Sequence, residues 1–348
     1  MSDSVSNLSS SLSMRMTVSR LQRELVEVRT QASTGKIADR GMALGSRSAL
    51  SVDLNEQVKR IETIRSMNAN VGARVDATQN VLDSMRSVIG SVMEQFLQAK
   101  SAGGDFKLVQ KTASDALATI NDKLNASFNG QYLFAGVNTD VRPMASDPID
   151  PSSPGRNAIN AAFLAHFGIN QSDPAVSSIS ASDVSDYLNG PFAALFEDSV
   201  WRTNFTGASE KVIRSRVSMS EIVDSSVSAD AKPFRDITRA LSIISASAID
   251  RMGAQSAGAA LDLALKALGE GLQGVTSMQS SLGAVQKRVE DATERLTIQS
   301  QSLAKTLGSI EDVDPYEVSV RLNTLSTQLD TAYALTSRMQ NLTLLKYL

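Results

Sequence analysis

The sequence has no cysteine, and it has a single histidine among its 348 residues. Without thiols the chain can form no disulfide, thiolate metal site or cysteine nucleophile. The histidine, His166, has no second ligand or carboxylate at the spacing of a metal or catalytic site. We interpret His166 as a surface or structural residue, and we expect no metal or other cofactor.

An excess of one charge and long apolar runs are also missing. The net charge of −3 offers no general attraction to nucleic acid. No segment approaches the roughly 18 to 20 apolar residues of a membrane-spanning helix, so we expect no membrane insertion. Residues 1–7 have neither the basic nor the apolar region of a Sec signal. If the protein leaves the cell, we expect export without a cleaved Sec signal.

Proline is nearly absent outside the middle of the chain. Residues 131–235 hold seven of the eight prolines and ten of the sixteen aromatic residues, and the flanks hold only Pro315. A proline inside a helix costs about 3 kcal/mol, so its absence permits long helices. The composition therefore predicts helical flanks around a turn-rich globular insert.

The flanks repeat apolar residues in alternating steps of three and four. The repeat runs from Met14 to Ala32, from Ile64 to Phe96, from Leu261 to Leu296 and from Leu322 to Leu345. This spacing places one narrow apolar stripe along each helix, as in a coiled coil. In the two terminal helices we predict an assembly and coiled-coil interface made of Val18, Leu21, Leu25, Val28, Leu322, Leu325, Leu329, Met339, Leu342 and Leu345.

Local signals divide the helices. Asp314 is a candidate N-cap for a helix with Pro315 in its first position and Glu317 in its third. Residues 101–105 break the first long helix and predict an antiparallel hairpin. Asn129-Gly130 predicts a left-handed helix end, and the Val- and Ile-rich residues 210–228 predict strands.

These signals predict a mainly α fold with an α+β or β-rich insert. The fold would be an elongated rod, with the N- and C-terminal helices paired as a coiled coil and the globular insert at the far end. Residues 1–45 and 310–348 would form terminal arms, 46–136 and 236–309 a helical rod, and 137–235 the insert. Because isolated helix pairs with narrow stripes are marginal, we expect the arms to be loose in the monomer and to order against neighbouring copies.

Four short segments, in matching order, resemble one protein family. They are Gln-Ala-Ser-Thr-Gly-Lys at 31–36, Asn-Gly-Gln-Tyr-Leu-Phe-Ala-Gly at 129–136, Leu-Gly-Ala-Val-Gln-Lys-Arg-Val at 282–289, and Glu-Asp-Val-Asp at 311–314 with the helix to Leu348. Together they resemble the flagellin-like hook-associated proteins of the bacterial hook–filament junction, within the flagellin superfamily. Residues 38–45 depart from the family's Asp-Asp-Pro-like stretch.

The resemblance implies an extracellular structural protein of the flagellum that joins hook to filament. It implies unfolded export through the flagellar type III apparatus and a cytoplasmic export chaperone at the C-terminal arm. The terminal helices would assemble with other copies of the chain, and the insert would face outward. The implied partners are the hook-side junction protein and filament flagellin.

Three alternatives stay open at this stage. Filament flagellin has the same layout, and only the ending Leu344-Leu345-Lys346-Tyr347-Leu348 favours the junction protein. A secreted translocator or pore-former would need a more apolar hairpin. An enzyme in the insert would need a catalytic constellation, and we find none. Residues 269–274 have part of a phosphate-loop spacing but lie within a helical heptad, and residues 311–314 lack the spacing of a calcium loop.

Overall fold

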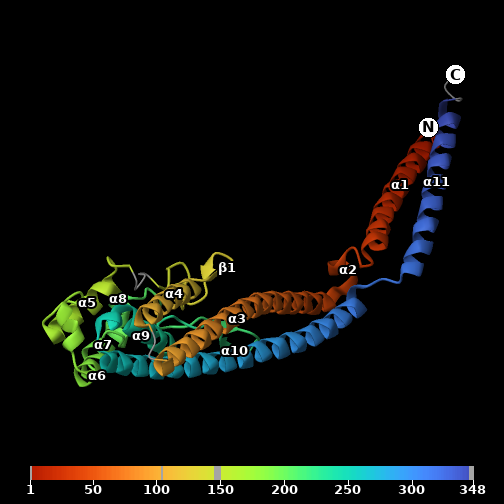
Figure 1. The fold of residues 1–348 in the computed structure, drawn as a ribbon. Helices are drawn as coiled ribbons and strands as arrows, with labels where there is room; N and C mark the ends of the chain where they lie inside the picture. The colour runs from red at the N-terminus through yellow and green to blue at the C-terminus, as the bar shows by residue number, and fades with distance from the viewer. Residues whose placement is uncertain (1, 103–104, 145–149, 345–348) are drawn as a thin grey trace. The chain divides into compact units, whose positions relative to one another are not determined.

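A computed structural model describes residues 2–102, 105–144 and 150–344 (Figure 1). The chain divides into two compact units, residues 1–63 with 296–348 and residues 64–295. The first unit contains α1 (Ser2–Thr34), α2 (Arg40–Leu44), η1 (Gly45–Arg47) and α11 (Pro315–Leu344). The long helices α3 (Ser48–Ala102) and α10 (Ala254–Glu311) contribute to both units.

The second unit also contains the shorter elements. Its helices and turns are α4 (Phe106–Leu124), α5 (Pro154–Phe167), η2 (Pro174–Ser178), α6 (Ala181–Asn189), α7 (Pro191–Ala194), α8 (Asp198–Asn204), α9 (Lys232–Ala246) and η3 (Ile249–Arg251). Its strands form two antiparallel hairpins, β1 (Ser127–Phe128) with β2 (Gln131–Tyr132) and β3 (Arg214–Arg216) with β4 (Ile222–Asp224). The predicted fold class, mainly α with a small β component, is confirmed.

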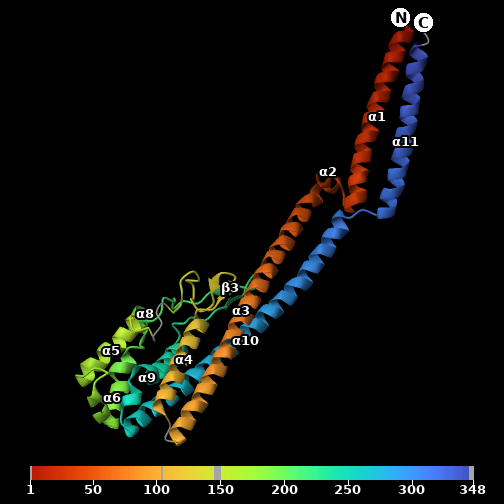
Figure 2. The same ribbon diagram turned by 45° about the horizontal axis from the view of Figure 1, so that its top comes forward.

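The helices α3 and α10 run antiparallel through the second unit (Figure 2). Gln79 Nε2 donates to the Gln279 carbonyl at 2.9 Å, and Gln286 Nε2 donates to Asp76 Oδ1 at 2.7 Å. The α3 repeat predicted from spacing faces inward. Its buried members are Ile64, Asn68, Val75, Thr78, Leu82, Met85, Ile89, Val92 and Phe96.

The predicted hairpin of α3 and α4 is present. Thr112 Oγ1 bonds to Gln95 Oε1 at 3.0 Å, and Lys123 Nζ donates to Ser84 Oγ at 2.6 Å, which fixes an antiparallel pair. At the start of α4, Asp105 Oδ1 accepts the Lys107 amide at 2.9 Å, so the helix has a side-chain N-cap.

The prediction that Asn129-Gly130 ends a helix is wrong. The helix α4 ends at Leu124 with Asn125 as its C-cap. Asn129 (φ 50°) and Gly130 (φ 78°) instead form the two-residue turn between β1 and β2. Two successive left-handed residues suit a hairpin turn, because the twist of that turn matches the twist of the strands.

The insert is α+β and shares its core with the rod helices. Trp201 stacks on Phe205 with ring centroids 5.0 Å apart, and both belong to one apolar cluster with rod residues such as Leu82 and Leu268. A β-carbon on Gly155 would lie 2.3 Å from Cε1 of Phe205, so only glycine lets the two chain segments approach this closely. The insert therefore depends on the rod for part of its packing.

The hairpin β3–β4, predicted within residues 210–228, lies against both long helices. Asn68 of α3 is buried, and its Nδ2 donates to the Val217 carbonyl at 2.9 Å and to Thr293 Oγ1 of α10 at 3.0 Å. On the surface, Arg288 Nε of α10 pairs with Glu221 Oε1 at 2.8 Å. Three segments distant in sequence are joined at this point.

Residues 269–274, whose glycine spacing resembles a phosphate loop, lie in the middle of α10. A β-carbon on Gly274 would lie 2.4 Å from Cγ of Pro233, and one on Gly271 would lie 2.5 Å from Cγ1 of Ile237. Pro233 and Ile237 belong to α9. These glycines therefore provide a close helix crossing.

Gly274→Ala should destabilise the second unit by about 1–3 kcal/mol, because the added methyl group overlaps Pro233. The matched control is Gly269→Ala in the same helix, where nothing lies within 4 Å of the new β-carbon. The control should stabilise the unit by about 0.5–1 kcal/mol through helix propensity. Urea unfolding measures both, and equal effects of the two substitutions would contradict the crossing as described.

Candidate assembly site and arm base

The first unit is built on an antiparallel pair of terminal helices, α1 and α11 (Figure 1). Gln22 Nε2 donates to the Tyr333 hydroxyl at 2.6 Å, midway along the pair. The apolar seam contains buried Leu21, Leu25, Val28, Val318, Leu325 and Ala332, with Val18, Val313, Leu322 and Leu329 partly buried beside them. The members of this cluster are all apolar, so burial of apolar side chains stabilises the pair.

Seven of the ten predicted interface residues meet in this seam: Val18, Leu21, Leu25, Val28, Leu322, Leu325 and Leu329. Met339 and Leu342 lie in α11, but their side chains are outside the described part of the structure, and Leu345 lies outside the described residues. Their role in binding other copies remains a proposal.

Sequence reasoning left three seam residues out of the predicted set: Val313, Val318 and Ala332. Val318 lies seven positions before Leu325, and Ala332 lies seven positions after it. The same heptad spacing that selected Leu325 would have found both. Val318 was left out because it lies in the first turn of α11, directly after the predicted helix start at Pro315.

Apolar side chains also remain on the outer faces of the pair. On α1, Leu12, Met16 and Val26 are exposed, with Val26 at 62%. On α11, Tyr316, Val320 and Leu335 are exposed, with Tyr316 at 79%. A groove of about 760 Å³ between the helices is lined by residues from both, including Met14 and Leu335. The arm pair thus offers apolar surface that a neighbouring molecule can cover.

At the base of the pair, the segment after α1 lies beside the segment before α11. Asp314 Oδ1 accepts the Tyr316 amide at 2.8 Å, so α11 starts with the predicted Asp cap and Pro315. Just before it, the Ile37 amide donates to the Glu311 carbonyl at 2.9 Å, and the Val313 amide donates to the Gly35 carbonyl at 3.0 Å. These bonds form an antiparallel bridge between Lys36 and Asp312.

A buried carboxylate lies at this bridge. The Glu311 side chain is fully buried and accepts hydrogen bonds from four side chains, and we call the five residues the arm-base cluster. Lys36 Nζ lies 3.1 Å from Oε2, and Arg40 Nη1 lies 3.3 Å from Oε1. Oε1 also accepts Ser51 Oγ, and Asn55 Nδ2 at 3.1 Å.

The charge of Glu311 is held in place by these partners. Burial alone would raise the pKa of the carboxyl, but the hydrogen bonds from Ser51 and Lys36 and the charges of Arg40 and Lys36 outweigh it. The net effect is a pKa lowered from its usual value. No sequence pattern links the five members of this cluster, because they are spread over residues 36–311.

Glu311 should make stability depend on pH in a defined window. Its folded pKa lies below the unfolded value of about 4.3, so its contribution is present above about pH 4.3 and is lost as the pH falls through the folded value. Glu311→Gln should therefore unfold at lower urea than the wild type at pH 7, and the gap should close in acid. Glu317→Gln, an exposed glutamate in α11, serves as control. A gap that persists to pH 2 would contradict this account.

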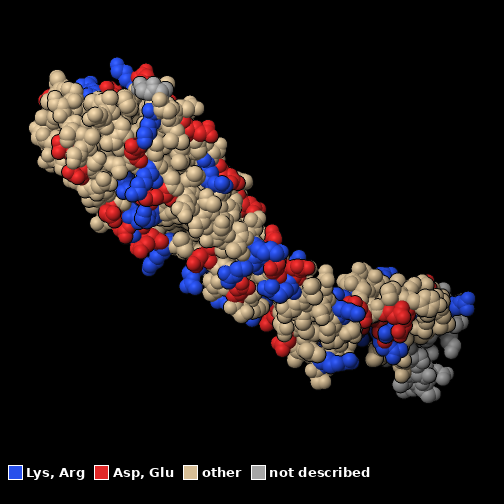
Figure 3. All heavy atoms as spheres, turned by 60° about the horizontal axis from the view of Figure 1, so that its bottom comes forward, with Lys and Arg blue, Asp and Glu red and all other residues tan. Residues whose placement is uncertain are grey.

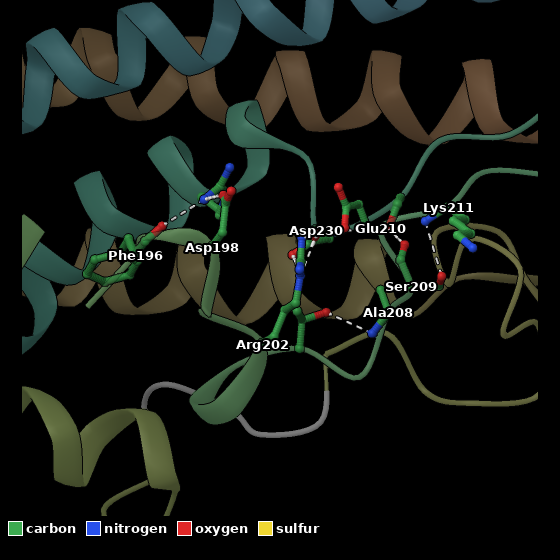
Figure 4. A network of polar contacts seen from close by, with 11 residues as sticks. Phe196, Asp198, Arg202, Ala208, Ser209, Glu210, Lys211 and Asp230 are labelled. Atoms are coloured by element: carbon green, nitrogen blue, oxygen red, sulfur yellow. Dashed lines mark hydrogen bonds and ion pairs between the residues drawn. The ribbon is translucent and has the colours of Figure 1, made fainter. Parts of the chain in front are cut away.

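Polar groups in the second unit form structural ties. Arg202 of α8 binds Asp230 through Nε and Nη2, one edge of its guanidinium, with Nη2 2.7 Å from Oδ2, and Nη2 also lies 3.2 Å from Glu210 (Figure 4). The hydrogen bond to Asp230 is the main cause of a raised pKa for Arg202. This network fastens α8 to the chain before α9. Among the described residues, no group of three or more His, Asp or Glu side chains is arranged to hold a metal ion.

The charges on one face of the protein do not gather by sign. On the face shown in Figure 3, basic and acidic side chains are interspersed. Within the described ranges, no helix combines the length and the apolar character that crossing a bilayer requires.

Two family models match the chain. The N-terminal helical region of bacterial flagellin matches residues 5–139, and the C-terminal helical region of bacterial flagellin matches residues 265–348. Together they cover more than half of the chain. No curated protein sequence matches it.

A solved structure has a similar fold. It is a putative flagellar hook-associated protein from Vibrio parahaemolyticus, with a TM-score of 0.51 and 13% sequence identity over 76% of this chain and 97% of that one. At this identity the likeness concerns the fold. The paired terminal helices and the two matched regions lead to one conclusion: the chain belongs to the flagellin family and is a structural, non-enzymatic subunit of the extracellular bacterial flagellum.

Proposed function

We propose that this subunit joins the hook to the filament. The observation that carries the proposal is the arm pair, whose seam is closed within one chain while apolar residues stay exposed on its outer faces. The resemblance of the C-terminal segment to junction proteins favours the junction over the filament. The solved relative described as hook-associated is consistent with this choice.

The proposed assembly mechanism depends on the narrow seam between the arms and on the exposed apolar residues of their outer faces. A pair of narrow stripes gives marginal stability in isolation, so the arms order fully when neighbouring copies cover their outer residues. Before assembly, an export chaperone holds the C-terminal arm, and the unfolded chain leaves through the flagellar type III apparatus. In the assembled state, the hook-side junction protein and filament flagellin contact the subunit from either side. In this proposal the arms, the helical rod and the insert meet at boundaries near residues 45, 136, 235 and 310.

Val26→Asp should block assembly while leaving the arm seam intact. Val26 is exposed on α1, and a charge there is buried without a partner once a neighbouring copy covers it. We expect at least a tenfold loss of incorporation onto isolated hooks, which corresponds to about 1.4 kcal/mol or more. Sedimentation with hooks measures it.

The control for this experiment is Glu27→Asp, the next residue of the same helix, which is exposed and keeps its charge. It should assemble like the wild type, and circular dichroism should report the same helix content for all three proteins. Normal incorporation of the Val26→Asp protein would contradict the assigned face.

The position along the flagellum separates the two candidate roles. An epitope tag after α5, at the exposed residues Gly168 and Asn170, should be visible by immunogold electron microscopy as a band at the hook–filament boundary. Label along the whole filament would instead establish the filament flagellin role. If neither the boundary nor the filament is labelled, both the junction role and the filament role are wrong.

A further inference from the structure

The arm-base cluster joins residues 36–55 to the end of α10. The Glu311 carboxylate accepts its side-chain hydrogen bonds from residues 36–55. Glu311 belongs to the last turn of α10, whereas its donors come from the bridge residue Lys36, from Arg40 in α2, and from Ser51 and Asn55 in α3. The carboxylate has no exposed surface. All of these residues lie in the first compact unit.

Separation of the two ends therefore has a cost on each side. If residues 35–55 detach, the Glu311 carboxylate loses all four side-chain donors and must exchange them for water. If residues 308–314 detach, Ser51, which is 2% exposed, loses its acceptor, and Lys36 and Arg40 lose the opposing charge. The two backbone bonds of the bridge break in either case.

The arm seam is made of apolar residues, and apolar burial tolerates small shifts of one helix along the other. The hydrogen bond from Gln22 to Tyr333 between the same helices is exposed. A carboxylate with four donors accepts one arrangement, because each hydrogen bond depends on distance and angle. The cluster thus holds residues 36–55 and the end of α10 in one defined register.

We propose that the arm-base cluster couples the folding of the two chain ends: residues 35–55 order only when residues 308–314 are in place, and the reverse. The cluster marks where the order of the free subunit stops and the assembly-dependent arms begin. That second statement rests on the proposed ordering of the arms during assembly, whereas the coupling stands on the geometry alone.

Hydrogen–deuterium exchange of the full-length free subunit tests the coupling. In the wild type we expect residues 36–55 and 305–314 to exchange more slowly than the outer arms, residues 2–30 and 320–340. Glu311→Gln should speed exchange at least about tenfold in both 36–55 and 305–314, the factor that corresponds to about 1.4 kcal/mol. Exchange within residues 64–295 should not change.

Two comparisons make the result decisive. Glu317→Gln, at an exposed site three residues into α11, should leave exchange at 36–55 unchanged. A chain ending at residue 310 should repeat the effect of Glu311→Gln at 36–55 even though it keeps α3 and most of α10. Faster exchange around residue 311 alone, or an equal rise throughout 64–295, would overturn the coupling.

The experiment separates this inference from the proposed function. If the outer arms of the wild-type subunit exchange as slowly as residues 36–55, ordering on assembly is wrong. The comparison of Glu311→Gln with the wild type at 36–55 still decides the coupling in that case.

Discussion

A helix with a single apolar stripe must find a partner for that stripe, and this constraint organises the whole chain. The stripes of α3 and α10 meet in the second unit, and those of α1 and α11 meet in the first. Because each pair takes one helix from either end of the sequence, neither flank is complete without the other.

Apolar stripes hold helices together but specify their register weakly. Hydrogen bonds from buried polar side chains fix that register. Asn68 joins α3 to the Val217 carbonyl and to α10. Arg74 Nη2 reaches the Tyr132 carbonyl at 2.6 Å and fixes the β1–β2 hairpin on α3. Glu311 performs the same task at the arm base. A buried polar group tolerates few alternative partners, so each tie selects one arrangement.

The arm pair has a closed apolar seam and exposed apolar residues on its outer faces. Residues such as Leu25 and Val28 are used within the molecule, whereas Val26 between them points outward. Aromatic residues of the middle segment, such as Trp201 and Phe205, lie in a core shared with α3 and α10. Its polar network of Arg202 and Asp230 is a structural tie.

The sequence by itself determined the helical flanks, seven of the ten seam residues and the start of α11 at Pro315, because proline placement and heptad spacing are local properties. Its four short motifs also pointed to the flagellin family. Only the tertiary structure decided that Asn129-Gly130 turns a hairpin, because a left-handed pair fits a helix end or a turn and the partner strand makes the difference. The tertiary structure likewise decided the arm-base cluster. Lys36 and Glu311 are 275 positions apart, and no spacing rule links residues that meet only when both chain ends fold together.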